Sequence, residues 1–192
     1  LIVKMNCWDG FESGITQEEG VLTAKAIEQC GADAVVVSGG FVSRAPMYVM
    51  RGRIPVDIMA YFIRESWKKF FVKLAGEQLI PPVPFTEGYF MEEAKRIQSA
   101  IKIPVVLVGG MNSMRTIEKA MAEGFQWIAM ARALIENPHF VNDLRNEVIE
   151  KSGCTICNYC VAKMYSGEMA CHLHQNNLPE ALKQKIAALN HA

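Results

Sequence analysis

Apolar runs of strand length alternate with amphipathic stretches of helical length along most of the chain. The strand-like runs lie at residues 2–6, 34–40, 103–108 and 126–131. The helix-like stretches lie at about 16–30, 88–101, 112–123 and 138–151. Because the runs are apolar on both faces, they are typical of parallel strands buried under helices. The alternation predicts an α/β fold of four consecutive parallel strands with right-handed helical crossovers, and eight such units would close a barrel.

The first helix-like stretch carries boundary signals at both ends. Thr16 is followed three residues later by Glu19, the pattern of a capping box, and Gly31 is a typical C-terminal stop. We expect this helix to run from about Thr16 to Cys30, with Cys30 in helix packing. Cys7 comes just after the first strand, so contact with substrate is one interpretation of it.

The connection between residues 41 and 87 is too long to be a plain loop. It places apolar residues at helical spacing opposite charged ones: Met59, Ile63, Trp67, Phe70 and Leu74 against Arg64, Glu65, Lys68 and Lys69. We expect a helical insertion that buries this apolar stripe over the catalytic face. The alternative is a helix that docks on a membrane surface or a partner, because aromatic residues stand beside the lysines.

Composition and the first residues bound the class of protein. The chain opens with LIVKMN, a core-strand pattern without a lead-in, so we expect a fragment, a processed chain or the ordered part of something longer. With 51% hydrophobic and 21% charged residues, disorder is not expected. Lys+Arg and Asp+Glu are both 20, which disfavours a general nucleic-acid or membrane surface. No apolar run has the roughly 18 residues of a membrane span and no signal-peptide pattern is present, so we expect a cytoplasmic protein.

Residues 103–140 form a strand–helix–strand–helix unit whose strands end in small residues. In a (β/α)₈ barrel, the loops after strands 7 and 8 bind phosphate through exposed backbone N–H groups. Gly109 and Gly110 would let a phosphate approach the backbone, and Ala131 is nearly as small. Arg132 could form a charge-assisted pair with the anion. This unit predicts a bound phosphorylated cofactor.

Four cysteines close to the C-terminus carry a second signal. Cys154, Cys157, Cys160 and Cys171 have the spacing C-x2-C-x2-C-x10-C. Four thiolates in so short a stretch can hold an iron–sulfur cluster or a tetrahedral zinc ion, and unoccupied or redox-active thiols are the third interpretation. His172 and His174 are substitute ligands in principle. We therefore divide the chain into half of a barrel at 1–151, with its helical insertion at 41–87, and a Cys-rich metal-binding segment and tail at 152–192.

These segments together resemble the C-terminal half of the old yellow enzyme family of NADH:flavin oxidoreductases, which are FMN-binding (β/α)₈ barrels. The closer resemblance is to the branch of 2,4-dienoyl-CoA reductase and trimethylamine dehydrogenase. The motif IVKMN resembles family strand 5, AVVVSGG strand 6, VVLVGG strand 7, and WIAMARALIENPHF strand 8 with its helix. The last is the most specific, although Ala131 stands where the family usually has glycine. The cysteines after the strand-8 helix match the iron–sulfur branch in place and roughly in spacing.

The resemblance implies roles for particular residues. Lys4 would place a cation near the flavin N1–C2=O edge, where it stabilises the anionic reduced flavin. Gly109, Gly110, Ala131 and Arg132 would hold the FMN phosphate. The four cysteines would hold a [4Fe–4S] cluster. The histidine-containing pair that activates substrate follows strand 4 in this family, so no catalytic residue of that kind is expected in this chain.

The resemblance therefore implies part of an FMN-dependent NAD(P)H oxidoreductase. Hydride would pass from the nicotinamide to flavin N5 and then to an electron-poor C=C bond of an enone or enoyl substrate. The expected partner is the missing N-terminal half of the barrel, or a second copy of the chain in its place; neither nucleic acid nor a membrane surface is expected. The alternatives are another phosphate-binding barrel with a structural zinc site, and a non-enzymatic metal-binding half-barrel that works through a partner.

Overall fold

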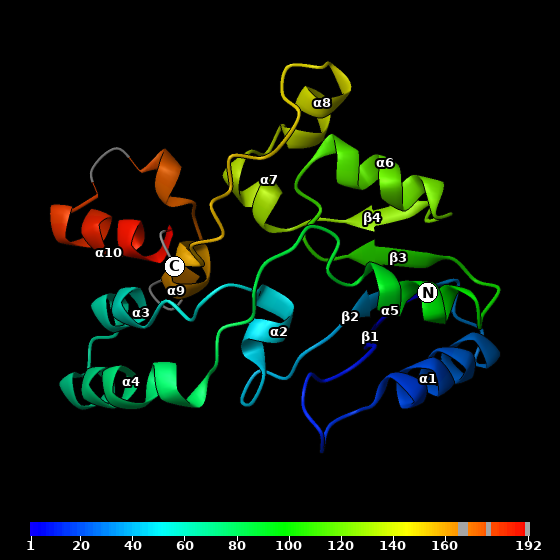
Figure 1. Ribbon diagram of the computed structural model, residues 1–192, viewed down its shortest axis with the longest axis horizontal. Helices are drawn as coiled ribbons and strands as arrows, with labels where there is room; N and C mark the ends of the chain where they lie inside the picture. The colour runs from blue at the N-terminus through cyan, green and yellow to red at the C-terminus, as the bar shows by residue number, and fades with distance from the viewer. Residues whose placement is uncertain (165–168, 176–177, 191–192) are drawn as a thin grey trace.

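A four-stranded parallel sheet organises the computed structural model, which describes residues 1–164, 169–175 and 178–190 (Figure 1). The strands are β1 (Ile2–Asn6), β2 (Ala34–Ser38), β3 (Val105–Val108) and β4 (Trp127–Ala129). They pair in chain order, and every neighbouring pair is parallel. The predicted α/β fold with four consecutive parallel strands is therefore confirmed.

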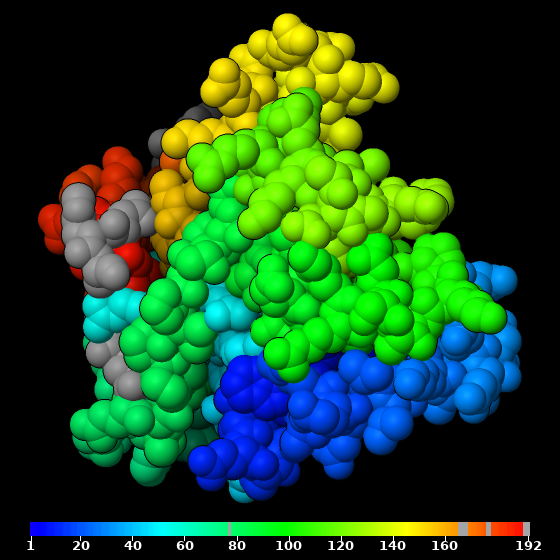
Figure 2. Space-filling model, turned by 45° about the vertical axis from the view of Figure 1, so that its right-hand side comes forward, coloured from blue at the N-terminus to red at the C-terminus, as the bar shows by residue number. Residues whose placement is uncertain are grey.

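One face of the sheet is covered by the helices that connect its strands. These are α1 (Gln17–Gln29), α5 (Met91–Gln98) and α6 (Met114–Ala122). Side chains alternate between the two faces of a strand, and Met5, Val35, Val37 and Leu107 point into the core that these helices complete. Figure 2 shows the α1, α5 and α6 segments, blue to green, packed against one another over this side of the molecule.

The opposite face of the sheet is apolar but much less covered. The register places Lys4 beside Val36, Val36 beside Val106, and Val106 beside Trp127. Ile2 and Trp127 are 66% and 61% exposed, and Lys4 is exposed as well. Parallel sheets are normally buried on both faces. This open face is therefore suited to receive further protein.

The N-terminus of α1 forms as its sequence predicts. The Thr16 hydroxyl accepts a hydrogen bond from the Glu19 N–H at 3.2 Å, and the Glu19 carboxylate accepts one from the Thr16 N–H at 2.9 Å. A side chain at Gly20 would place its Cβ 2.4 Å from the Cys7 carbonyl oxygen. Glycine is required at this position because α1 approaches the backbone after β1 so closely.

The 41–87 connection forms three helices rather than one apolar stripe. They are α2 (Pro46–Met50), α3 (Val56–Phe62) and α4 (Ser66–Leu79). The chain is extended at Ile63, which breaks the stripe between α3 and α4. Trp67, Phe70 and Leu74 are 63%, 62% and 58% exposed. The expected burial of the whole stripe is wrong because this break turns the apolar side of α4 to the surface.

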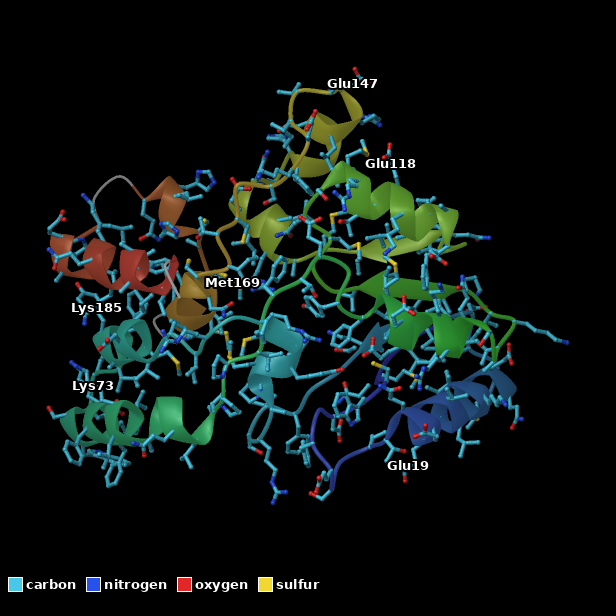
Figure 3. All side chains as sticks on the ribbon, viewed as in Figure 1. Glu19, Lys73, Glu118, Glu147, Met169 and Lys185 are labelled. Atoms are coloured by element: carbon cyan, nitrogen blue, oxygen red, sulfur yellow. The ribbon has the colours of Figure 1, made fainter. Side chains whose placement is uncertain are left out.

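The insertion and the C-terminal tail form a second lobe. Helix α9 (Tyr159–Lys163) and helix α10 (Glu180–Asn190) pack with α3, and Ile58, Tyr159 and Leu182 are buried in their shared core. Lys73 on α4 and Lys185 on α10 both approach the Asp57 carboxylate, at 3.6 and 3.4 Å (Figure 3). Segments about 100 residues apart in the chain thus lie side by side, and the proposed boundary at residue 151 stays a prediction.

After β4 the chain forms α7 (Arg132–Glu136) and α8 (Phe140–Arg145) in place of one helix over 138–151. The Val148 N–H reaches the Asp143 carbonyl and the Glu147 N–H reaches the Leu144 carbonyl, at 2.9 and 3.1 Å. Glu147 is left-handed, with a φ of 57°. This Schellman-type ending stops α8 well before residue 151. No helix of the described residues is both long and apolar enough to cross a membrane.

Candidate functional site

The carboxyl ends of the strands meet the second lobe. In Figure 1 the arrowheads of β3 and β4 point toward α2, α7 and α9. Gly109 and Gly110 follow β3, and Ala131 and Arg132 follow β4. Ligands of open α/β sheets bind outside the carboxyl ends of the strands. The structure thus brings the four predicted phosphate-site residues to the edge where a ligand of this fold class binds.

Gly109 and Gly110 have positive φ values of 114° and 69°, which favour glycine. A Cβ on Gly110 would lie 2.9 Å from the Thr86 carbonyl oxygen, and one on Gly109 would lie 2.9 Å from the Tyr89 ring. Close packing of the backbone against residues 86–90 is thus enough to require both glycines.

Arg132 provides a more specific observation. Its Nη1 donates a hydrogen bond to Asn158 Oδ1 at 2.9 Å, and its guanidinium lies 6.0 Å from the Phe85 ring centroid. Among the described residues it forms no ion pair with a carboxylate. A half-buried cation that faces only neutral groups lacks the counter-charge that normally accompanies burial. Arg132 therefore fits an anionic ligand such as a phosphate.

A second arginine, Arg51, lies at the same edge and was not singled out from the sequence. Its guanidinium is 4.6 Å from the Tyr48 ring centroid, 4.4 Å from that of Tyr89 and 5.6 Å from that of Phe90. Its Nε is buried without a hydrogen-bond partner, and its backbone is left-handed with a φ of 58°. The sequence signal is weak, because only the following Gly52 marks an unusual turn.

Asn158 connects the two arginines. Its Nδ2 donates hydrogen bonds to the carbonyl oxygens of Arg51 and Arg53 at 2.8 and 3.1 Å, while its Oδ1 accepts the bond from Arg132. It is only 2% exposed, and its own backbone is left-handed. Since Asn158 lies between Cys157 and Cys160, it links the cysteine segment to the predicted phosphate site.

The four cysteines gather in one region with free thiols. Cys157 is buried, and Cys154, Cys160 and Cys171 are half-buried. Burial raises the pKa of Cys160 to about 11, and the neighbouring Cys154 adds to that rise. Burial also raises the pKa values of Cys154 and Cys171. Over residues 1–164, 169–175 and 178–190, however, no three His, Cys, Asp or Glu side chains are arranged to hold one metal ion.

Two further contacts bear on the metal hypothesis. The Glu136 carboxylate accepts hydrogen bonds from the Ser152 hydroxyl at 2.8 Å and the Gly153 N–H at 3.0 Å, which fixes the start of the cysteine segment against α7. The His172 Nε2 atom is buried and has no partner, whereas the His174 ring contacts the Glu136 carbonyl oxygen. The donor chemistry of thiols with one unpartnered imidazole fits a metal, although these atoms do not converge in this structure.

The remaining predicted residues lie apart from this cluster. Lys4 is in the middle of β1 and exposed on the open face of the sheet. Cys7 is 2% exposed in the core under α1, and its pKa is raised to about 12 by burial and by the charge of Glu93. The interpretation of Cys7 as a substrate contact is therefore wrong, because its thiol is buried in the core. Cys30 caps α1 and is exposed, so the expected packing role is also wrong.

Comparison with known proteins places the chain near redox enzymes. No protein-family model matches it. It is 35% identical over 170 residues to a 4,4'-dithiodibutanoate disulfide reductase of Rhodococcus erythropolis, covering 87% of this chain and 41% of that protein. It is 27% identical over 151 residues to an NADH oxidase of Thermoanaerobacter brockii, covering 77% of this chain and 18% of that protein. The chain therefore spans less than half the length of both relatives.

A second kind of relative has a different activity. The chain is 32% identical over 114 residues to the imidazole glycerol phosphate synthase subunit HisF of Alkaliphilus metalliredigens. This match covers 55% of this chain and 44% of that protein. It is shorter than the matches to the two redox enzymes, and the name of this relative includes a phosphorylated compound.

The two isolated cysteines give a direct test of the burial pattern. We expect iodoacetamide at pH 8 to alkylate Cys30 in the folded protein and to leave Cys7 unmodified. Cys7 is shielded from the reagent, and its raised pKa leaves very little reactive thiolate. Peptide mass spectrometry would measure both sites, with a urea-denatured sample as the control in which both react. Equal labelling of Cys7 and Cys30 in the folded protein would contradict the structure.

Proposed function

We propose that this chain is part of an FMN-dependent NAD(P)H oxidoreductase of the old yellow enzyme type. The observation that carries the proposal is the Arg132 guanidinium, which forms no ion pair with a described carboxylate and follows β4 at the same carboxyl edge of the sheet as Gly109 and Gly110. Similarity to a disulfide reductase and an NADH oxidase supports a redox activity rather than a purely structural role. Phosphate binding and redox chemistry together favour a phosphorylated redox cofactor.

The proposed architecture is the second half of a (β/α)₈ barrel, strands 5 to 8. Its support is that the strands follow one another in chain order with their helices on one face and an open apolar face opposite. That open face would become the interior of a closed barrel. The 152–192 segment would be the metal-binding extension of this barrel.

Particular residues of the chain would hold FMN. Arg132 would bind the phosphate, with backbone groups of Gly109, Gly110 and Ala131 around it, and Lys4 would bring its ammonium group to the open face where the flavin ring would lie. Bound FMN would supply hydride transfer from NAD(P)H to an electron-poor acceptor. This chain would bind and orient the cofactor, and residues that activate substrate would come from elsewhere in the protein.

Two kinds of bond are proposed as the hydride acceptor, each on its own evidence. The resemblance to ene-reductases favours an electron-poor C=C bond of an enone or enoyl thioester. The 35% identity to an enzyme named for reduction of a dicarboxylate disulfide adds an S–S bond as the second acceptor. Rates of NAD(P)H oxidation by the full-length protein with cyclohexenone and with 4,4'-dithiodibutanoate would separate them, and absence of both rates would argue against the proposed activity.

One other function has a specific observation in its favour. The match to an imidazole glycerol phosphate synthase subunit favours a barrel that binds a phosphorylated small molecule without a flavin. The absorption spectrum of the purified full-length protein distinguishes the two. A visible flavin absorption band supports the oxidoreductase, whereas a colourless protein that binds sugar phosphates supports the alternative.

The FMN assignment is tested at Arg132. We expect Arg132→Ala to weaken FMN binding by the full-length protein by about 1.5–3 kcal/mol, since a charge-assisted hydrogen bond is lost. Quenching of FMN fluorescence on binding would give the dissociation constants. Arg145→Ala is the matched control, because Arg145 is exposed and its side chain bonds only Asn142 among the contacts described. Equal FMN affinities of the wild type and the Arg132 variant would contradict the assignment of Arg132 to the FMN phosphate.

The metal proposal makes a separate prediction. If Cys154, Cys157, Cys160 and Cys171 hold a [4Fe–4S] cluster, anaerobic purification should give about four iron atoms per chain. Cys157→Ser should lower that content sharply, while Cys30→Ser, at an exposed site outside the cluster, should leave it unchanged. One zinc per chain would support the alternative metal. A protein free of both metals after anaerobic preparation would contradict the proposal.

The proposed partner is the remainder of the barrel. The two edge strands, β1 and β4, lack a second neighbour in the described sheet, and such edges pair readily with other chains. We expect the isolated 192-residue chain to form dimers or larger species on size-exclusion chromatography, and to lack ene-reductase activity. Co-expression with the N-terminal half should give a single complex. A stable monomer that reduces an enone with NAD(P)H would contradict this proposal.

A further inference from the structure

We propose that Arg51 is a second anion-binding residue, that it acts with Arg132 on one oxyanion, and that Asn158 positions the pair. The oxyanion is a phosphate monoester or a carboxylate. The oxyanion could belong to either of two ligands, as the phosphate of FMN or as an acidic group of the substrate. The choice of these two ligands rests on the proposed function. The arrangement of the two arginines themselves comes from contacts within this chain.

Burying the Arg51 guanidinium among aromatic rings costs free energy unless a ligand accepts its hydrogen bonds. Three aromatic rings, those of Tyr48, Tyr89 and Phe90, lie within 5.6 Å of its guanidinium. Aromatic faces attract a cation but cannot accept the hydrogen bonds that its N–H groups gave to water. The Nε is buried without an acceptor, and Arg51 makes no ion pair with Glu93, which instead accepts a bond from the Tyr48 hydroxyl at 3.2 Å. Arg51 therefore forms no ion pair with a described carboxylate, and the charge of the nearby Glu93 reaches it only across the Tyr48 ring.

Tyr89 joins the two arginines. Its ring centroid is 4.4 Å from the Arg51 guanidinium, and its hydroxyl donates a hydrogen bond to the Val49 carbonyl at 2.6 Å. Burial raises the pKa of Tyr89, and the charges of Arg132 and Arg51 both oppose that rise. The two guanidinium groups therefore flank one tyrosine, and neither has a carboxylate partner among the described residues. An anion that binds both guanidinium groups would supply the opposite charge that each of them lacks as an ion-pair partner.

Asn158 determines where the two arginines lie relative to each other. Its single amide binds the Arg132 side chain on one side and the carbonyl oxygens of Arg51 and Arg53 on the other. All three bonds are 2.8 to 3.1 Å long. A buried amide that satisfies three groups fixes them more firmly than exposed contacts would. Asn158 is thus a positioning residue, and it makes the anion site depend on the folding of residues 154–160.

The geometry is suited to an oxyanion because guanidinium groups bind phosphate and carboxylate through paired N–H donors. Arg132 leaves part of its donor set free after its bond to Asn158, and no bond from the terminal nitrogens of Arg51 is formed with a described residue. A neutral ligand would leave both positive charges unpaired. An anion therefore matches this pair better than a neutral polar group does.

The first experiment compares FMN with riboflavin, which lacks the phosphate. In the full-length protein, Arg51→Gln and Arg132→Gln should each weaken FMN binding about tenfold to a hundredfold and leave riboflavin binding unchanged, if the phosphate is the anion. The double variant should then lose less than the product of the two single effects, because both residues act on one group. Arg64→Gln, at an exposed arginine of the insertion, is the control that should change neither ligand.

The second experiment tests the substrate as the source. If the oxyanion is a substrate carboxylate, Arg51→Gln and Arg132→Gln should each leave FMN affinity unchanged and weaken 4,4'-dithiodibutanoate binding about tenfold, while binding of the uncharged dimethyl ester is unaffected. A shared effect of the two variants on either ligand supports the proposal. It is overturned if Arg51→Gln binds FMN and 4,4'-dithiodibutanoate as tightly as the wild type, or if the two variants weaken different ligands. Arg51→Lys, which keeps the charge, replaces the glutamine variant if the latter fails to fold.

A third measurement separates this inference from the cofactor assignment. Inorganic phosphate binding, followed by ³¹P nuclear magnetic resonance on flavin-free protein, should weaken in both arginine variants even if the wild type binds no flavin. Asn158→Gly keeps the left-handed backbone available but removes the three bonds, so it should also weaken phosphate binding. Asn158→Asp should weaken it at least as much, because the carboxylate would neutralise Arg132 and cannot donate to the carbonyl oxygens of Arg51 and Arg53. Phosphate binding that is equal in the wild type and all of these variants would overturn the paired-arginine site.

Discussion

The parallel pairing of β1, β2, β3 and β4 sends every loop that follows a strand to one edge of the sheet. Gly109, Gly110 and Arg132 meet there although they belong to two different strand ends. Because the strands are joined through helices on one face, the other face remains free. A site at the carboxyl edge and an open apolar face thus have the same cause, namely the direction in which the strands pair.

The second lobe contributes residues to the carboxyl edge of the sheet. Helices α3, α9 and α10, far apart in the chain, build a common core around Ile58, Tyr159 and Leu182. That packing brings Asn158 to the ends of the strands, where it bonds the Arg132 side chain and the Arg51 carbonyl oxygen. Without the second lobe, Arg132 would have neither the amide that orients it nor the neighbouring positive charge. The insertion therefore contributes to the site as well as covering it.

The cysteine segment lies between α7 and the two arginines. It begins against α7 through Glu136 and reaches the arginines through Asn158. Asn158 lies between Cys157 and Cys160 and bonds Arg132, so the segment joins the proposed metal-binding cysteines to the proposed anion site.

The sequence by itself determined the strands, the capping box at Thr16 and the parallel order, because these depend on local periodicity and short-range hydrogen bonds. It also located Gly109, Gly110 and Arg132 at strand ends. The tertiary structure decided the rest: the exposure of Trp67 on α4, the burial of Cys7, and the role of Asn158. Asn158 bonds a carbonyl 107 residues away, and no local pattern encodes such a contact. Packing between distant segments fixes these features, since each residue's burial depends on which remote helix lies against it.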